Sequence, residues 1–189
     1  MRESEEVASI VEDLLVASRM DRGQMNMASD AVRLDEELCS IVEVCDVDVE
    51  PIRIEPLTVL GDSIRIHQIS RNLITNADRY GGDHVTVSVF ADGPEAVLAV
   101  RDNGPGIPAD ALPHIFEPFY TTKKVGTGSG LGLSVSRKIV DLHGALIDIR
   151  NSPSGGLEAL LIFAVAPAPS AVPPVDPVPA AEPDPTGTD

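Results

Sequence analysis

Glycine occupies every second position of the stretch GTGSGLG at residues 126–132. From there, Leu131, Val135 and Ile139 recur at the spacing of one helix face. Glycine permits backbone conformations that are closed to other residues, and a helix start presents unpaired N–H groups at the positive end of its dipole. This combination is typical of a phosphate-binding loop. The spacing alone is equally compatible with an ordinary flexible loop ahead of a helix.

The composition limits the class of protein. A chain of 189 residues with 43% hydrophobic residues is long enough for one domain with a sizeable core. The net charge of −16 argues against sequence-independent binding of nucleic acid. The longest apolar run, residues 159–166, is too short to insert across a membrane. Cys39 and Cys45 form no CxxC pair, which favours a reduced, cytoplasmic protein.

The N-terminal third of the chain contains a helical pattern followed by shorter elements. Apolar residues recur at helical spacing in residues 1–22. So short a helix needs a partner for its apolar face, either within the domain or in a helical bundle. Leu34 and Ile41 indicate a second helix. Alternating apolar residues at 44–60 indicate one or two strands, which Pro51 places at a sheet edge or at a break.

Residues 62–80 form the longest predicted helix. Asp62 can cap it, and apolar residues at steps of three and four, ending at Tyr80, define a buried stripe. Asn72 and Asn76 share a different face. Asparagine is unfavourable inside helices, so this pair indicates either a solvated surface or a site where the Asn76 carbonyl ligates Mg²⁺.

Residues 83–107 predict a hairpin that ends in a glycine loop. Alternating valines, a turn at Gly93-Pro94 and a returning apolar strand lead to Asp102. A buried carboxylate at a strand end can accept a hydrogen bond from a base amine, and the glycines after it let a planar ring approach the backbone. The alternative is an ordinary Asx turn after a strand.

Residues 108–130 join the two glycine-rich stretches. The segment contains Phe116, Phe119 and one of the chain's 2 tyrosines. Because the rest of the segment is polar and glycine-rich, Phe116 and Phe119 are expected to anchor a mobile lid. Lys123 and the lysine after it are placed to meet phosphate charge, although exposed lysines are also common on a solvated surface.

The remaining segments complete the fold class. A helix is expected to end near His143-Gly144, and strands follow at residues 145–150 and 157–165. The order of elements predicts an α+β fold. It is a two-layer sandwich of a mixed, mostly antiparallel sheet with helices on one face, preceded by one helix. Residues 166–189 are rich in proline and acids and contain no basic residue, which predicts a disordered tail.

Four segments occur in one order along the chain: RNLITNADRYGG, VRDNGPGIP, FEPFYTTK and GTGSGLGLSVSRKIVDLHG. They resemble the asparagine box, first glycine box, aromatic box and second glycine box of bacterial sensor histidine kinases. The same Bergerat-type ATP-binding domain occurs in type II topoisomerases, mismatch-repair ATPases and large heat-shock chaperones, which together form the GHKL superfamily. The resemblance implies a catalytic domain at residues 23–165. Residues 1–22 resemble part of the dimerisation and phosphotransfer hairpin that precedes it.

The resemblance implies ATP and Mg²⁺ as cofactors. Asn76 would hold Mg²⁺, Asp102 would bind the adenine amine, and Arg79 and Lys123 would act with Asn76 in catalysis. The second glycine box and the lid would enclose the phosphates. The implied nucleotide-binding residues are Asn72, Asn76, Arg79, Tyr80, Asp102, Gly104, Gly106, Ile107, Phe119, Gly126, Thr127, Gly128, Ser129, Gly130, Leu131 and Gly132.

One position distinguishes among the members of this superfamily. Relatives that hydrolyse ATP or phosphorylate serine carry a glutamate one helical turn before the magnesium asparagine. In this chain the position is Asn72, which has no useful basicity. A histidine acceptor is already nucleophilic and needs little activation. The sequence therefore favours phosphoryl transfer to histidine, by positioning and charge stabilisation, over a slow ATPase.

The acceptor histidine is where the chain departs from the family. The acceptor normally lies on a preceding hairpin and is usually followed by an acid, but none of His67, His84, His114 and His143 is followed by one. Each is expected to be structural or on the surface. The sequence thus predicts a fragment of a longer kinase, or half of a split kinase, that phosphorylates a histidine outside this chain.

Such a kinase would have several partners in two-component signalling. They are an acceptor domain or partner kinase half, a response regulator and, through the first helix, a second copy of the chain. A partner or a parent sensor would provide any association with a membrane. The alternative hypothesis is a non-catalytic nucleotide-binding module that docks on a kinase or a response regulator.

Overall fold

The computed structural model describes residues 11, 14–16, 18–19, 26–45, 47–122 and 129–166. Expectations for the tail, for Lys123 and for most of residues 1–22 lie outside these ranges. The elements in chain order are β1 (Asp30–Arg33), α2 (Leu34–Cys45), β2 (Val49–Ile54), β3 (Thr58–Gly61), α3 (Ser63–Tyr80), β4 (Val85–Asp92), β5 (Glu95–Asp102), a 3₁₀ turn (Leu112–His114), α4 (Gly132–Leu142), β6 (Leu146–Asn151) and β7 (Leu157–Ala164).

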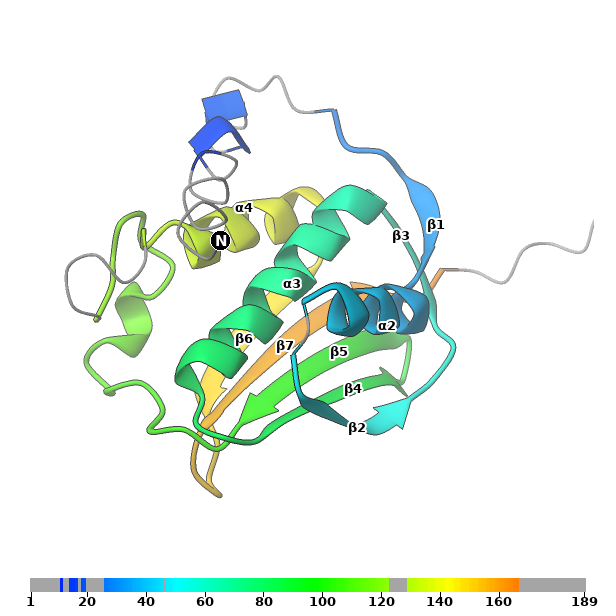
Figure 1. Cartoon of the computed structure of the whole chain (residues 1–189). Coiled ribbons are helices and arrows are strands. Elements are labelled where there is room, and N and C mark those ends of the chain that lie inside the picture. The colour runs from blue at the N-terminus through cyan, green and yellow to red at the C-terminus, as the bar shows by residue number, and fades with distance from the viewer. Residues whose placement is uncertain are drawn as a thin grey trace, which may run out of the picture.

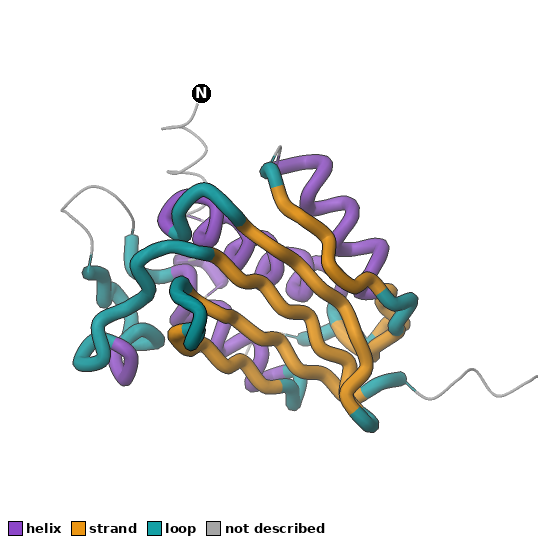
Figure 2. Tube along the Cα trace, turned by 90° about the horizontal axis from the view of Figure 1, so that it is seen from below, coloured by secondary structure: helices purple, strands orange, loops and turns teal. Residues whose placement is uncertain are grey.

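The described strands form two sheets. The larger sheet has five strands in the order β2-β4-β5-β7-β6 (Figure 1). Strand β2 runs parallel to β4, and the other neighbouring pairs are antiparallel. Helices α2, α3 and α4 cover one face of this sheet, and no described helix covers the other (Figure 2). The predicted two-layer α+β architecture is therefore confirmed.

Helix α3 occupies the centre of the helical layer. Its N-cap is Asp62, whose Oδ1 accepts a hydrogen bond from the Arg65 N–H at 3.2 Å, as its position in the sequence predicts. Ile66 and Ile69 are fully buried, and each such side chain contributes about 1.5–3 kcal/mol by its burial. Tyr80 was expected to continue this stripe but is 38% exposed, because it lies in the last turn where the helix leaves the core.

Two further elements show how tertiary pairing decides local structure. The predicted edge position of Pro51 is confirmed, since β2 is the outermost strand and its register shifts between Pro51 and Arg53. Strand β1 was not predicted. It has few apolar residues and forms by antiparallel pairing with β3, in which Ala31 lies opposite Leu60.

The N-terminal residues that the structure describes are helical. Val16 is only 3% exposed and belongs to the hydrophobic core, whereas Val11, Leu14 and Leu15 are about half exposed. The described residues of this segment thus bury only part of their apolar surface against the domain. Among the described residues, none of the helices is both long enough and apolar enough to cross a lipid bilayer.

The helix-free face of the sheet carries a small ion-pair network. Glu158 on β7 pairs with Arg101 on β5 and with Arg150 on β6, whose Nη2 lies 2.6 Å from the Glu158 carboxylate. Burial acts to raise the pKa of Glu158, but hydrogen bonds from Arg150 and Arg101 outweigh it, so the pKa lies below its ordinary value.

This network makes stability depend on pH. A carboxylate whose pKa is lower in the folded state adds stability above its unfolded pKa and loses it as pH falls through the folded value. We expect Glu158→Gln to lower the free energy of unfolding by about 1 kcal/mol at neutral pH, with the difference shrinking below about pH 4. Urea unfolding across this range measures it. Glu95→Gln, at an exposed position at the start of β5, is the control. A deficit for Glu158→Gln that does not change with pH would contradict the prediction.

Candidate functional site

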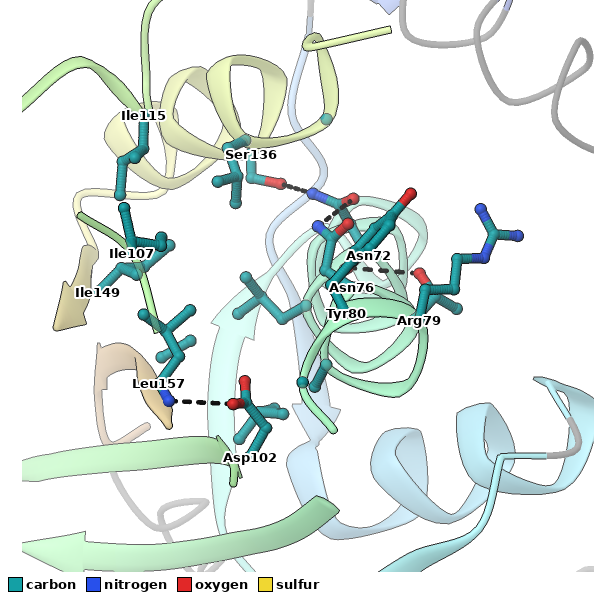
Figure 3. Close-up of a pocket in the computed structure, with 18 of the residues that line it drawn as sticks. Asn72, Asn76, Arg79, Tyr80, Asp102, Ile107, Ile115, Ser136, Ile149 and Leu157 are labelled. Atoms are coloured by element: carbon teal, nitrogen blue, oxygen red, sulfur yellow. Dashed lines mark hydrogen bonds between the residues drawn. The ribbon is translucent and has the colours of Figure 1, made fainter. Parts of the chain in front are cut away.

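A cleft of about 1010 Å³ lies between α3, the loop after β5 and the start of α4 (Figure 3). The structure brings most of the predicted nucleotide-binding residues to its wall. These are Asn72, Asn76, Arg79, Tyr80, Asp102, Gly106, Ile107, Ser129, Gly130 and Gly132. Lys123, Gly126, Thr127 and Gly128 lie outside the described residues.

Asp102 ends β5 at the floor of the cleft and is only 8% exposed. Its Oδ1 accepts hydrogen bonds from the Gly104 N–H at 2.9 Å and from the Leu157 N–H at 3.0 Å. Figure 3 shows the hydrogen bond from Leu157, at the start of β7, to one carboxylate oxygen of Asp102; the other oxygen, Oδ2, takes no part in this bond. Two backbone donors thus hold the carboxylate in place and leave Oδ2 to accept a hydrogen bond from a ligand.

Glycines allow the backbone to pack closely around Asp102. A Cβ on Gly81, which caps the C-terminus of α3, would collide with the Asp102 side chain. A Cβ on Gly104 would lie 2.7 Å from the Gly81 carbonyl carbon. Gly104 was predicted to bind the nucleotide. It does not line the cleft but supports Asp102 from behind, through this close packing and its N–H.

Asn72 and Asn76 lie on the cleft face of α3 and are joined by a hydrogen bond (Figure 3). Asn72 Nδ2 donates to Ser136 Oγ on α4 at 2.9 Å, and Asn76 Nδ2 donates to Asn72 Oδ1 at 3.2 Å. This chain of donors assigns the orientation of both amides. The Asn76 amide nitrogen is engaged, so its carbonyl oxygen is the atom available to a ligand.

That oxygen suits a hard cation held mainly by phosphate. The described part of the chain contains no group of three or more His, Cys, Asp or Glu side chains that could hold a metal by itself. Mg²⁺ accepts one or two protein oxygens when phosphates and water complete its octahedron. The residues present therefore fit Mg²⁺ bound together with a nucleotide, with Asn76 as its protein ligand.

The last glycines of the second glycine box also have a packing role. A Cβ on Gly132 would lie 2.6 Å from Asn72 Oδ1, so the glycine leaves room for the Asn72 side chain where α4 begins against α3. Gly130 adopts a φ of 67° and packs against the backbone of Phe119. Leu131, another predicted nucleotide-binding residue, is 4% exposed and packs inward, away from the cleft wall.

The aromatic box is anchored by one phenylalanine and not by two. Phe116 packs against the core, and the Arg137 guanidinium lies 5.6 Å from its ring centroid. Phe119 was expected to be a second anchor and a nucleotide contact, but it is 67% exposed and does not line the cleft. Its φ of 66° turns the chain here, and its N–H donates to Gly130 O at 2.9 Å. Tyr120 lines the cleft instead.

The remaining predicted residues lie on the two sides of the cleft. Ile107 is pinned by Asn151, which accepts the Ile107 N–H at 2.8 Å and donates to the Ile107 carbonyl at 2.7 Å. Arg79 and Tyr80 end α3 and are exposed, with Arg79 directed away from the apolar wall at Ile107 (Figure 3).

Sequence reasoning missed several residues at this site. Ser136 and Leu157 give no local signal, since one is a serine inside a helix and the other is an ordinary strand residue. Ile115, directly after the 3₁₀ turn, and Ile149, on β6, complete the apolar wall of the cleft (Figure 3). Gly81 could have been found, because a glycine pair directly after a predicted helix marks a cap.

The described histidines all have partners within the domain. His67, His84 and His114 each lie within 3.1 Å of a glutamate carboxylate. His143 bonds to backbone groups of α4 and of Asp62. These contacts agree with the structural or surface roles that their sequence contexts predict.

The family model described as histidine kinase-, DNA gyrase B- and HSP90-like ATPase matches residues 61–167. This match covers more than half of the chain, so the protein belongs to that family. The matched range contains all the residues that line the cleft except Val44 of α2.

Similar proteins include named sensor kinases. The signal transduction histidine-protein kinase AfsQ2 of Streptomyces coelicolor is 35% identical, over 89% of this chain and 32% of its own length. The probable sensor histidine kinase TcrY of Mycobacterium tuberculosis is also 35% identical, over 80% of this chain and 34% of its own length. The chain thus spans about a third of the length of these relatives.

Solved structures agree with this assignment. A mycobacterial sensor histidine kinase, MprB, superposes with a TM-score of 0.66 at 25% identity, over 75% of this chain and 100% of that one. Full-length ShkA, crystallised with AMPPNP, gives a TM-score of 0.72 at 27% identity, over 88% of this chain and 38% of that one.

The link between Asn72 and Ser136 can be tested by stability. We expect Ser136→Ala to lower the free energy of unfolding by about 1 kcal/mol, because the Asn72 amide loses its acceptor. Chemical unfolding measures the change. Ser136→Thr, which keeps the hydroxyl, should recover most of it. Ser134→Ala is the control, because Ser134 is also buried in α4 but bonds only to Leu131 O next to its own helix. Equal decreases in the free energy of unfolding for Ser136→Ala and Ser134→Ala would argue against a special role for the hydrogen bond between Asn72 and Ser136.

Proposed function

We propose that this chain binds Mg²⁺-ATP and transfers the γ-phosphoryl group to a histidine outside the chain, in two-component signal transduction. The observation that carries the proposal is the presence of Asp102 and Asn76 in one cleft of a histidine kinase-type domain. The first is an acceptor for a base and the second is an oxygen ligand for a cation.

Asp102 favours adenine as the base. Its Oδ2 is an acceptor, and the 6-amino group of adenine is a donor, whereas guanine carries an acceptor oxygen at the same position. Ile107 and Ile149 supply apolar surface on the wall of the cleft that faces α3 (Figure 3). The rigid backbone donors on Asp102 keep the acceptor in position before the nucleotide arrives, which lowers the cost of ordering on binding.

Asn76 supports a role for Mg²⁺ at the phosphates. Because its amide nitrogen donates a hydrogen bond to Asn72 Oδ1, its carbonyl oxygen is the atom left to bind a cation. When bound, Mg²⁺ neutralises charge on the transferring phosphoryl group. Arg79 and Lys123 are proposed to assist at the same end of the nucleotide, as the resemblance to sensor kinases implies.

The acceptor is proposed to be a histidine elsewhere. Each described histidine is engaged in a contact within the domain. Asn72 offers no carboxylate to activate water, which disfavours hydrolysis. In the transfer, an imidazole nitrogen would form the new N–P bond while the bond from the γ-phosphorus to the bridging oxygen breaks, and ADP leaves with that oxygen.

The partners in this proposal follow from the family. They are an acceptor hairpin in a parent chain or a partner, a response regulator, and a second copy through the N-terminal helix, all acting in the cytoplasm. Residues 1–22 would form part of that hairpin and residues 23–165 the catalytic domain. The exposed Val11, Leu14 and Leu15 support a helical partner for the first helix.

Calorimetry tests the nucleotide site. We expect ATP to bind in a Mg²⁺-dependent manner, and Asp102→Ala to weaken binding at least tenfold, because a hydrogen bond to a charged group is worth about 1.5–3 kcal/mol. Asn76→Ala should remove most of the Mg²⁺ dependence. Asp92→Ala, at the exposed end of β4, is the matched control and should bind normally. Binding that is unaffected by Asp102→Ala would exclude this carboxylate as the base acceptor.

Transfer is tested with γ-labelled ATP and an added acceptor hairpin from a related sensor kinase. We expect label to appear on the hairpin, to be absent when its histidine is changed to glutamine, and to fall by at least two orders of magnitude with Asn76→Ala. Nucleotide binding without transfer would favour the docking module. Steady phosphate release that needs Asn76 would favour the slow ATPase.

A further inference from the structure

His143 joins the C-terminal end of α4 to the N-terminal end of α3. It is the C-cap residue of α4, and its Nδ1 lies 2.8 Å from the carbonyl oxygen of Ile139 in the same helix. Its Nε2 lies 3.0 Å from the backbone nitrogen of Asp62, the N-cap residue of α3. One imidazole thus connects the two helices that carry Asn72, Asn76 and Ser136.

These two contacts define the protonation state of the ring. A carbonyl oxygen only accepts hydrogen bonds, so Nδ1 must carry the proton that is donated to Ile139. A backbone N–H only donates, so Nε2 must be the unprotonated acceptor for Asp62. The geometry therefore requires a neutral imidazole in the Nδ1–H tautomer.

The surroundings of the ring restrict it to this position. Its plane is nearly perpendicular to that of Phe163 on β7, with ring centroids 6.2 Å apart. A Cβ on Gly61 would lie 2.7 Å from His143 Cδ2, so the glycine at the end of β3 makes room for the ring. The His143 ring is therefore fixed by packing as well as by hydrogen bonds at the junction between α3, α4 and the sheet.

We propose that His143 is a positioning residue for the nucleotide site and that its protonation opens the junction between α3 and α4. A proton on Nε2 would make this nitrogen a donor that faces another donor, the Asp62 N–H. The hydrogen bond between Asp62 and His143 would therefore break. The two helices meet again at Asn72 and Ser136. A shift at the His143 end changes the alignment of that second link, and with it the orientation of Asn76. This inference rests on the proposed nucleotide site.

The charged groups near the ring are already engaged. On α3, the Asp62 carboxylate accepts the N–H groups of Arg65 and Ala28, so it would have to leave the helix cap to receive a proton from the ring. On α4, Asp141 pairs with Arg137 at 3.2 Å. Phe163 and Gly61, from the two strands packed against the ring, carry no charge. Protonation of His143 therefore costs the hydrogen bond to Asp62. Among the described elements, a carboxylate could compensate for this loss only by giving up a bond that it already makes.

Two amide variants separate the two bonds of His143. Glutamine reaches as far as Nε2 of the ring, so His143→Gln can still accept from Asp62 but cannot titrate. Asparagine reaches only as far as Nδ1, so His143→Asn can bond to Ile139 but not to Asp62. We expect His143→Gln to bind ATP as the wild type does at about pH 8, and His143→Asn to bind about fivefold more weakly, as the loss of one hydrogen bond implies.

The experiment combines ¹⁵N NMR of the imidazoles with Mg²⁺-ATP calorimetry, on the full chain, from about pH 8 to about pH 5.5. We expect the Nδ1–H tautomer at His143, and a fall in affinity towards acid that is present in the wild type and in the His84→Gln control but absent from His143→Gln. Thermal unfolding checks that each variant is folded.

Three results would overturn the proposal. They are an Nε2–H tautomer, equal affinities for His143→Gln and His143→Asn, or the same acid dependence in His143→Gln as in the wild type. If ATP binds to no variant, the proposed function fails. The tautomer, and the response of the Asp62 amide to pH, would then still decide whether the junction exists and opens.

Discussion

The hydrogen bond between Asn72 and Ser136 is the contact on which the candidate site depends most. It joins α3 to α4 at 2.9 Å, and through Asn72 it engages the Asn76 amide nitrogen and leaves the Asn76 carbonyl oxygen available to a ligand. Gly132 gives the Asn72 side chain room at this contact, because a Cβ there would lie 2.6 Å from Asn72 Oδ1. The glycine that begins α4, at the end of the glycine-rich stretch, therefore also allows the close approach of two helices.

Asp102 depends in the same way on strand pairing. In the antiparallel register of β5 and β7, Arg101 lies opposite Glu158, which brings the end of β5 beside the start of β7. The Leu157 N–H can then bond to the carboxylate. Asp102 is thus held by the central strand of the sheet, while the described part of the segment after it is attached to the core by the side chains of Ile115, Leu112 and Phe116.

Sequence patterns predicted the α+β class, the capped helix after Asp62 and the placement of Asp102 at a strand end, because each rests on local periodicity or turn chemistry. They missed Ser136 and Leu157, whose roles arise from elements brought together only by folding. The expectation for Phe119 was wrong for a similar reason. Hydrophobicity predicts burial on average, but here a positive φ directs the chain outward.

The edge strand β2 has a consequence for how copies of this domain meet. Pro51 has no N–H, and the ladder with β4 is interrupted directly after it. An edge with a missing donor and a broken register is a poor template for another strand. Two copies brought close together would therefore not join their sheets along this edge.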